Sequence, residues 1–375
     1  MSAESPVSHA PGISQIGFDN DQYLHAQLEA FQDRMDSMSG APLIVEFGGK
    51  PFGDHHASRV LPGYDPHVKA EIIRNLQEQK NSKIAMVVNA RDVLYPPMGR
   101  TQNGRIRGDS GLRYEDETIR MIRESGDLHG FDVDKVVLAV TPLELPEQGK
   151  RHLGSFAAKL TRQTGKELLY HYEVPDYPKI HSIDGEKLHE VFVHNDTVSD
   201  PDRNLLLLSP GGGSGKFGVA LSEVYKGLAE GRPVGFAKFE TFPIFKMSSG
   251  HPLNLAFIAA TADLGNYLVE MKDGQTNYDK DCENFELLAS MAERMDDPAG
   301  HISAMTSQFD FSVNVIEKGI TDERLVEEAA RNEISRRLER YKNEYRNGDE
   351  KLSTIERASY IAGVCATYFA YRSIA

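Results

Sequence analysis

Six short apolar runs, separated by stretches with helical spacing, constrain the fold of this chain most strongly. The runs lie at 43–49, 83–90, 135–141, 167–174, 204–208 and 233–238. Strands that alternate with helices of this length form a mostly parallel sheet with helices on both faces. We therefore expect an α/β fold with two Rossmann-like parallel-sheet units, the second with a P-loop-like strand, loop and helix, plus a helical C-terminal part.

The length of the chain and the spacing of these runs predict several segments. With 375 residues, the chain is longer than a domain with one hydrophobic core usually is. Residues 175–203 are polar and contain three prolines, which is typical of a linker or a small excursion. The expected segments are a flexible N-terminus at 1–15, an N-terminal α/β domain at 16–174, the linker or excursion at 175–203, a P-loop-like α/β unit at 204–264 and a mainly helical C-terminal region at 265–375.

Charge and composition exclude several classes of protein. The chain has 42 Lys and Arg against 56 Asp and Glu, so its formal net charge is −14 and we expect no nucleic-acid partner, which would require clustered cations. The first residues lack a signal-peptide pattern, and no apolar run is long enough to cross a membrane. Two distant cysteines exclude a disulfide scaffold and the common zinc motifs. We therefore expect a cytoplasmic protein without a membrane partner.

Residues 204–218, NLLLLSPGGGSGKFG, form the most informative motif. A buried strand, a glycine-rich loop, a lysine and a helical segment follow one another, as in P-loops of the pattern GxxxxGK[ST]. Free backbone amides, a helix N-terminus and a lysine all favour an anion. The match is incomplete, because Pro210 replaces the first glycine and Phe217 replaces the magnesium-binding hydroxyl. The predicted phosphate-binding residues are Gly211, Gly212, Gly213, Ser214, Gly215 and Lys216.

The same motif is also compatible with a tight turn whose lysine is merely solvated. The strand before the loop, the helix after it and the position of Lys216 favour anion binding over that interpretation. The missing hydroxyl at Phe217 weakens the case for a nucleotide as the anion, although Ser214 could substitute with a different geometry.

Several long blocks resemble one bacterial family. They are IGFDNDQYLHAQ (16–27), EFGGKPFGDHHASRVLPGYDP (46–66), NARDV (89–93), IRGDSGLRYEDE (106–117), SPGGGSGK (209–216) and GFAKFETFPIFKMSSGHPLNLAFIAATADL (235–264). In these blocks the chain resembles the UPF0371 family, also called DUF1846, which has no settled activity. The resemblance implies that typical members continue into a further α/β subdomain, and that the segment after Asp263 differs from theirs.

The segment after the first strand supplies candidate substrate-binding residues. Lys50, His56 and Arg59 match the family block and follow a strand end, where open α/β sheets place ligands. Arg107 lies in a glycine-rich loop after the second strand and is suited to a carboxylate or phosphate clamp. The alternative for each is a solvated charge on a surface loop.

Further candidates follow the strand at 233–238. Lys238 and Glu240 should approach the same end of the sheet as Lys216, where Lys238 could balance a phosphate and Glu240 could hold magnesium or act as a base. His251 and Asn254 begin the next helix, where a histidine is a possible acid or base but is often only a cap. Asp263 ends that helix and is a second possible magnesium ligand.

These residues favour an ATP-dependent enzyme, kinase- or ligase-like, that acts on a small metabolite. In this hypothesis Lys216 and the loop amides hold the phosphates, and Lys238 and Arg59 neutralise developing charge. Either Glu240 or Asp263 would help to place Mg²⁺. The expected cofactors are therefore ATP and magnesium.

Two alternatives remain open. In the first, the loop holds a phosphate or carboxylate of the substrate, and a nucleotide-independent lyase, hydrolase or transferase uses His56 and His251 as acid and base. In the second, the chain is a non-catalytic ligand-binding or scaffold protein whose last helices form a dimer interface. Under each of the three hypotheses we expect a homo-oligomer.

Overall fold

The computed structural model describes residues 16–53, 55–95, 101–102, 105–106, 112–174, 185–262, 277–295, 297–348, 350 and 352–372. The N-terminus expected to be flexible, 1–15, lies outside these residues. No helix in the described ranges is long and apolar enough to span a membrane.

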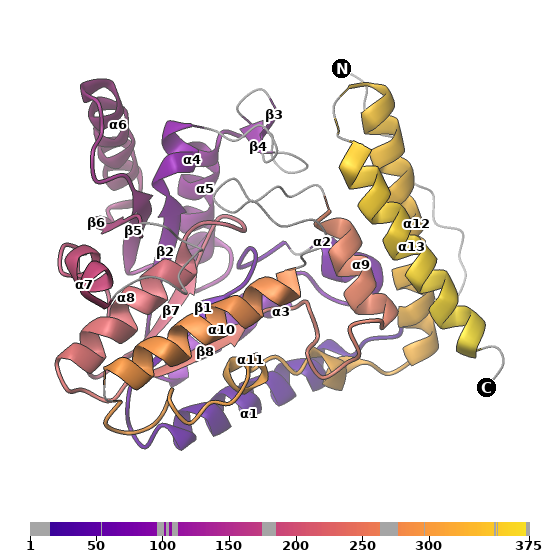
Figure 1. The fold of residues 1–375 in the computed structure, drawn as a ribbon, viewed down its shortest axis with the longest axis horizontal. Coiled ribbons are helices and arrows are strands. Elements are labelled where there is room, and N and C mark those ends of the chain that lie inside the picture. The colour runs from indigo at the N-terminus through magenta and orange to yellow at the C-terminus, as the bar shows by residue number, and fades with distance from the viewer. Residues whose placement is uncertain are drawn as a thin grey trace.

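A six-stranded sheet forms the centre of the molecule, and its strands are parallel throughout (Figure 1). Across the sheet the strands are β6 (Glu167–Tyr172), β5 (Lys135–Thr141), β2 (Ser82–Asn89), β7 (Asn204–Leu208), β1 (Leu43–Phe47) and β8 (Gly235–Phe239). A separate antiparallel pair consists of β3 (Thr101–Gln102) and β4 (Arg105–Ile106). All six apolar runs identified in the sequence therefore form strands of one sheet.

Helices cover both faces of this sheet and continue beyond its edge. They are α1 (Asn20–Ser37), α2 (His55–Val60), α3 (Val68–Gln79), α4 (Ala90–Leu94), α5 (Tyr114–Asp127), α6 (Glu147–Thr164), α7 (Gly185–Phe192), α8 (Lys216–Ala229), α9 (Pro252–Ala260), α10 (Asn277–Arg294), α11 (Gln308–Phe311), the 3₁₀ helix η2 (Ile316–Gly319), α12 (Glu323–Arg346) and α13 (Leu352–Arg372).

Alternation along the strands divides the core into two layers. Within β1, Val45 packs on the face covered by α1, α3, α5 and α6, whereas Ile44 packs on the face covered by α7, α8 and α10. The same alternation separates Leu206 from Leu207 in β7. This is the arrangement that buried parallel strands require, since both faces must be covered by helices.

The C-terminal part is helical, as expected. The long helices α12 and α13 lie side by side beyond the β8 end of the sheet and pack on α9 (Figure 1). The buried Tyr341 of α12 donates a hydrogen bond from its hydroxyl to the Ala259 carbonyl oxygen of α9 at 2.8 Å. This hydrogen bond ties the helical part to the element that follows the sheet.

The α/β class, the parallel sheet and the helical C-terminal part are confirmed, but the two expected units share one sheet. β7 pairs with β2 on one side and β1 on the other, so the P-loop-like strand is inserted between strands of the first unit. Alternation of apolar runs identifies strands but does not decide which strands pair. The predicted domain boundaries stay a prediction.

Candidate functional site

The glycine-rich loop at 209–215 connects β7 to α8 and is held by the neighbouring strands. Gly215 has a φ of 91°, and a Cβ there would lie 2.7 Å from Val140 Cγ2 of β5, so glycine is required. Asn89, at the end of β2, donates from Nδ2 to the Gly213 carbonyl oxygen at 2.8 Å. The loop therefore has contacts with both β5 and β2.

The backbone beside this loop is strained. Val140 has a φ of 54°, a left-handed conformation that is unfavourable for a β-branched residue. It lies where the pairing of β5 with β6 shifts register, between Leu138 and Thr141. Such strain is often found where a structure positions a functional segment, and here the strained residue packs against Gly215.

One side of the loop is open, whereas the position after the lysine is not. A Cβ added to Gly211 or Gly212 would meet no heavy atom of the described chain within 4 Å. Phe217 is buried, and its ring makes an edge contact with Phe236 of β8, with 6.2 Å between ring centroids. The position that supplies a magnesium-binding hydroxyl in a standard P-loop is therefore occupied by a core aromatic side chain.

Lys216, the first residue of α8, is a buried cation. Its Nζ donates to Ser209 Oγ at 2.7 Å and lies 3.5 Å from Ser214 Oγ. Burial lowers the pKa of Lys216 to about 8, although the carboxylates of Glu46 and Glu240 oppose this shift. Lys216 is therefore charged at neutral pH but is held in an unfavourable environment.

Six charged side chains converge at the carboxyl end of β1, β7 and β8. We call this group the sheet-edge cluster; its members are Glu46, Lys69, Lys216, Lys238, Glu240 and Asp281. In the parallel pairing, Glu46 of β1 lies beside Lys238 of β8 and Leu207 of β7. Glu46 shares the face of Ile44, and Lys238 that of Phe236, because strand side chains alternate. Both therefore point toward the layer that contains α8 and α10.

Lys238 joins this cluster to α10. It forms ion pairs with Asp281 of α10, which is buried, and with Glu240 Oε1 at 3.2 Å. Burial opposes the charge of Lys238, but the carboxylates of Asp281, Glu240 and Glu46 outweigh it and raise its pKa. Lys238 is therefore a fully charged ammonium group at the edge of the sheet.

Glu46 differs from the other carboxylates of the cluster. Only 7% of the residue is exposed, and Oε2 has no hydrogen-bond partner within the described residues. A buried carboxylate oxygen without a partner is costly unless a cation or a donor can reach it. Because Glu46 affects the pKa of Lys216, it lies close to the end of the glycine-rich loop.

Gly48 leaves room for the Glu240 side chain, which follows β8, to lie against the end of β1. A Cβ at Gly48 would lie 2.2 Å from Glu240 Cγ, so any other residue would displace the Glu240 side chain. The Gly48 carbonyl oxygen accepts a hydrogen bond from Lys69 Nζ of α3. The double glycine after β1 thus brings Glu240 and Lys69 against the end of that strand.

Lys50 and Arg59 pair with acidic residues outside the sheet-edge cluster. Lys50 Nζ lies 3.6 Å from Oε1 of the buried Glu117 in α5. Arg59 Nη1 lies 3.9 Å from Oε1 of the buried Glu333 in α12. Following the same strand is therefore not sufficient to bring these cations to Lys216.

His56 packs against an aromatic ring, and Asn254 forms hydrogen bonds with the backbone. The His56 ring is edge-on to Phe242, with 5.2 Å between centroids. Asn254 Oδ1 accepts from the Ile244 amide at 2.7 Å, and its Nδ2 donates to the Ile244 and Ser248 carbonyl oxygens. These hydrogen bonds fix the loop before α9, and they account for the polar atoms of Asn254 without a ligand.

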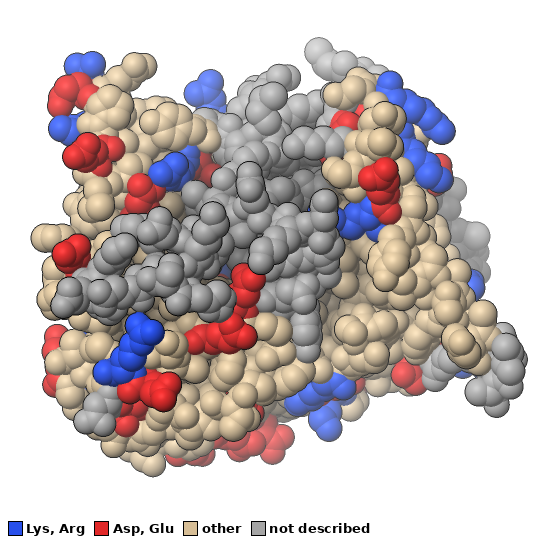
Figure 2. Space-filling view, viewed as in Figure 1, with Lys and Arg blue, Asp and Glu red and all other residues tan. Residues whose placement is uncertain are grey.

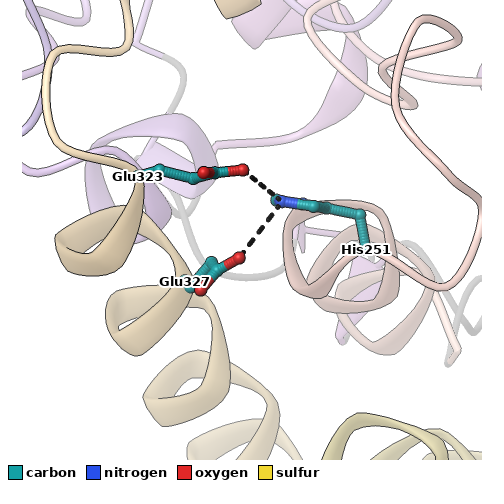
Figure 3. Close-up of side chains that lie close together, drawn as sticks. All are labelled: His251, Glu323 and Glu327. Atoms are coloured by element: carbon teal, nitrogen blue, oxygen red, sulfur yellow. Dashed lines mark ion pairs between the residues drawn. The ribbon is translucent and has the colours of Figure 1, made fainter. Parts of the chain in front are cut away.

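His251 caps α9 and faces α12 (Figure 3). Its Nδ1 accepts a hydrogen bond from the Leu253 amide at 3.3 Å. Its Nε2 lies 3.8 Å from Glu323 Oε1 and 3.7 Å from Glu327 Oε1. Tyr368 of α13 donates to the same Glu327 oxygen at 2.7 Å. His251 therefore belongs to a cluster of the helical part, formed by α9, α12 and α13.

The three donor atoms of His251, Glu323 and Glu327 have the spacing of a metal site, within 4.8 Å of one another. A metal-bound histidine normally donates a proton from its other ring nitrogen. In His251 that nitrogen accepts the Leu253 amide, so the neutral ring carries its proton on Nε2, toward the carboxylates. The arrangement favours a helix cap facing two carboxylates over a metal centre.

Two predicted site residues lie outside the described part of the chain. They are Arg107, a predicted substrate ligand, and Asp263, a predicted magnesium ligand. Both stay predictions.

Three members of the sheet-edge cluster were not selected from the sequence. Glu46 is a single acid inside the apolar run LIVEF, and that isolation in a buried strand is the signal that could have identified it. Lys69 lies on α3 between Val68 and Ala70, and Asp281 lies on α10 among polar residues. Their positions follow from tertiary packing and have no local signal.

Comparison with known proteins places these features in a family. The model described as "Domain of unknown function DUF1846, N-terminal" matches residues 16–364. A UPF0371 protein of Corynebacterium urealyticum is 36% identical over 332 residues, which cover 86% of this chain and 61% of that protein. A second, from Corynebacterium aurimucosum, is 35% identical over 363 residues, covering 94% and 68%. A third, from Clostridioides difficile, is 31% identical over 354 residues, covering 92% and 66%. The chain spans about two thirds of the length of these relatives.

Proposed function

The chain belongs to the UPF0371 family, and we propose that its sheet-edge cluster binds ATP with Mg²⁺ for a kinase- or ligase-like reaction on a small metabolite. The names of its relatives assign no activity, so support comes from the site itself. One observation carries the proposal. Glu46 has a buried carboxylate oxygen without a hydrogen-bond partner among the described residues, and its charge acts on the buried Lys216 at the end of the glycine-rich loop.

The phosphate side of this proposal uses the loop and two lysines. The loop amides of 211–215 and the N-terminus of α8 supply partial positive charge, and Lys216 adds a full charge. Lys216 now donates to Ser209, an interaction that a phosphate oxygen could replace. Lys238 is a second ammonium group of the same cluster, and phosphoryl transfer depends mainly on such positioned charge.

The magnesium side uses carboxylates in place of a loop hydroxyl. P-loop enzymes hold Mg²⁺ with a loop Ser or Thr and an acid on a neighbouring strand. Glu46 fits the second role, since β1 is paired with β7 and Glu46 Oε2 lacks a partner among the described residues. The first role cannot be filled by Phe217, so Glu240 is the second proposed ligand. Bound Mg²⁺ would neutralise charge on the transferred phosphoryl group.

A second function is favoured by the aromatic residue at 217. Without the hydroxyl, the loop could instead hold a phosphate or carboxylate of the substrate, and the enzyme would work without nucleotide or magnesium. Glu46 and Glu240 would then be candidates for proton transfer. The two functions differ in whether Mg²⁺ strengthens the binding of the ligand at the glycine-rich loop: it should do so for ATP and not for a substrate phosphate or carboxylate.

Glu46→Gln is expected to separate nucleotide binding from magnesium binding. In the unchanged protein, ATP with Mg²⁺ at about 100 times its Kd should stabilise the fold by about 2.7 kcal/mol, which raises Tm visibly. The variant should keep the magnesium-free ATP effect and lose the additional effect of Mg²⁺, because the neutral amide is a poor ligand. Thermal unfolding with ATP, ADP, AMP and GTP, each with and without Mg²⁺, measures the rise in Tm caused by the nucleotide and the additional rise caused by Mg²⁺.

The matched control is Glu147→Gln, whose side chain is 75% exposed on α6. It should respond to ATP and Mg²⁺ as the unchanged protein does. If no nucleotide raises Tm under any of these conditions, the proposal is wrong. A rise in Tm with inorganic phosphate and no further rise with nucleotide or Mg²⁺ would favour the second function.

A further inference from the structure

A group of arginines surrounds one buried glutamate where α2 meets α12. Glu333 accepts two hydrogen bonds from Arg336, at 2.6 and 2.7 Å, and one from Arg337 at 2.7 Å. Arg59 of α2 approaches the same carboxylate, with Nη1 at 3.9 Å from Oε1. The three guanidinium groups thus come from two elements that are far apart in the sequence.

A fourth arginine and a second carboxylate lie next to this group. Arg340, one turn further along α12, affects the same Arg59 and forms an ion pair with Glu344 at 3.5 Å. Within the described residues, four guanidinium groups thus lie near the carboxylates of Glu333 and Glu344, in a chain whose formal net charge is −14. On the face shown in Figure 2, Lys and Arg side chains also gather over the end where α12 meets α13. A local excess of positive charge is unfavourable unless an anion is present.

Arg59 is the least satisfied member of this group. Its side chain is 44% exposed, and within the described residues it makes no hydrogen bond. Burial and then the charge of Arg336 lower its pKa, which shows that the neighbouring cations oppose its charge. Arg336 is also exposed, at 48% of its side chain, so a ligand from solvent can reach both.

We propose that Arg59, Arg336 and Arg337 form a second oxyanion site, separate from the glycine-rich loop, for the phosphate or carboxylate group of a small ligand. Guanidinium groups donate two parallel hydrogen bonds to such groups and keep their charge at any physiological pH. Glu333 holds Arg336 and Arg337 in place, while Arg59 has its donors available. This site does not depend on whether the loop binds ATP.

Isothermal titration with inorganic phosphate and with succinate tests this site in the full chain. Both anions are titrated into Lys216→Met protein, so that the glycine-rich loop contributes little, at constant ionic strength set with NaCl. Arg59→Ala and Arg336→Ala, each in this background, should raise the Kd at least tenfold. The anion that binds more tightly identifies the class of ligand. Circular dichroism confirms that each variant is folded.

Arg74→Ala is the matched control. Arg74 is 41% exposed and pairs with Glu71 on α3 at 3.3 Å, so it resembles Arg59 in exposure and lacks the other arginines. Its Kd for either anion should stay unchanged. The inference is overturned if neither anion binds the Lys216→Met protein, or if Arg59→Ala and Arg336→Ala bind as tightly as the control. A loss of nucleotide binding at the loop would leave this result unaffected.

Discussion

Lys216→Met is expected to stabilise the protein while removing nucleotide binding. Burial lowers the pKa of Lys216 to about 8 from the ordinary lysine value of 10.5, so its charge is disfavoured in the folded state by about 3 kcal/mol. Methionine has a similar length and no charge. The free energy of unfolding at pH 7 should therefore rise, by up to about 3 kcal/mol, an estimate that follows from this pKa difference.

The stability gained by Lys216→Met should depend on pH in a specific way. Because the folded pKa is the lower one, the unfolded chain binds more protons between about pH 8 and 10.5. The stability of the unchanged protein should therefore recover as the pH rises through this window. The advantage of Lys216→Met should be complete below pH 8 and vanish toward pH 10.5. Denaturant unfolding of both proteins at pH 7, 8, 9 and 10 measures the difference.

The same variant should bind ATP about 100-fold more weakly, since a hydrogen bond from a charged group to phosphate contributes about 1.5–3 kcal/mol. Lys150→Met is the control, because Lys150 is 60% exposed on α6 and pairs only with Glu147 among the described residues. Lys150→Met should change neither the free energy of unfolding nor the free energy of ATP binding by more than about 0.5 kcal/mol. A Lys216→Met protein that is less stable at pH 7, or that binds ATP normally, would contradict the role given to this lysine.

Asp281→Ala is expected to destabilise the protein by about 3–5 kcal/mol, because it removes one partner of a buried ion pair. Asp281 and Lys238 are both buried, at 3% and 6% exposure, and among the described residues Glu240 and Glu46 would remain to balance the Lys238 ammonium. The pair also joins α10 to the sheet. Chemical denaturation should show a lower midpoint without a change in the slope with denaturant.

A double variant distinguishes the cost of an unpaired charge from a loss of packing. Lys238→Met combined with Asp281→Leu should recover part of the lost stability, because neither member of the Lys238–Asp281 pair is then buried without the other. Asp132→Ala is the control, since its carboxylate is 70% exposed beside Lys166 and should contribute less than about 1 kcal/mol. If the double variant is no more stable than Asp281→Ala, the pair acts through packing and not through charge.

The elements of the fold could be predicted from the sequence because each depends on a local pattern. The apolar run at 204–208 is β7, and the segment expected to be helical from 216 is α8. Short helices without such a pattern were not predicted, including α7 inside the expected linker at 175–203. The helix spans eight residues, Gly185–Phe192, too few for periodicity to identify it.

The site could be predicted only for residues at the carboxyl ends of strands in the same part of the sheet, where β1 lies between β7 and β8. Lys238 and Glu240 were expected to meet Lys216, and the charges of both affect its pKa. Lys50 and Arg59 follow β1 as well, yet Lys50, in the loop before α2, pairs with an acid on α5, and Arg59, on α2, pairs with an acid on α12. A position just after a strand predicts the edge of the sheet near which a residue lies. The direction of its side chain depends on how the following loop folds.

The position of β7 within the sheet also affects how this chain can fold during its synthesis. The amide of Leu43 in β1 donates to the Asn204 side chain, 161 residues away, and β1 pairs only with β7 and β8 within the described sheet. A nascent chain that has passed β6 therefore carries a complete but unpaired β1 strand. Such long sequence separation slows folding and exposes strand edges to aggregation. The strands β2, β5 and β6 pair with one another without β7, whereas β1 can join them only after β7 has been synthesised.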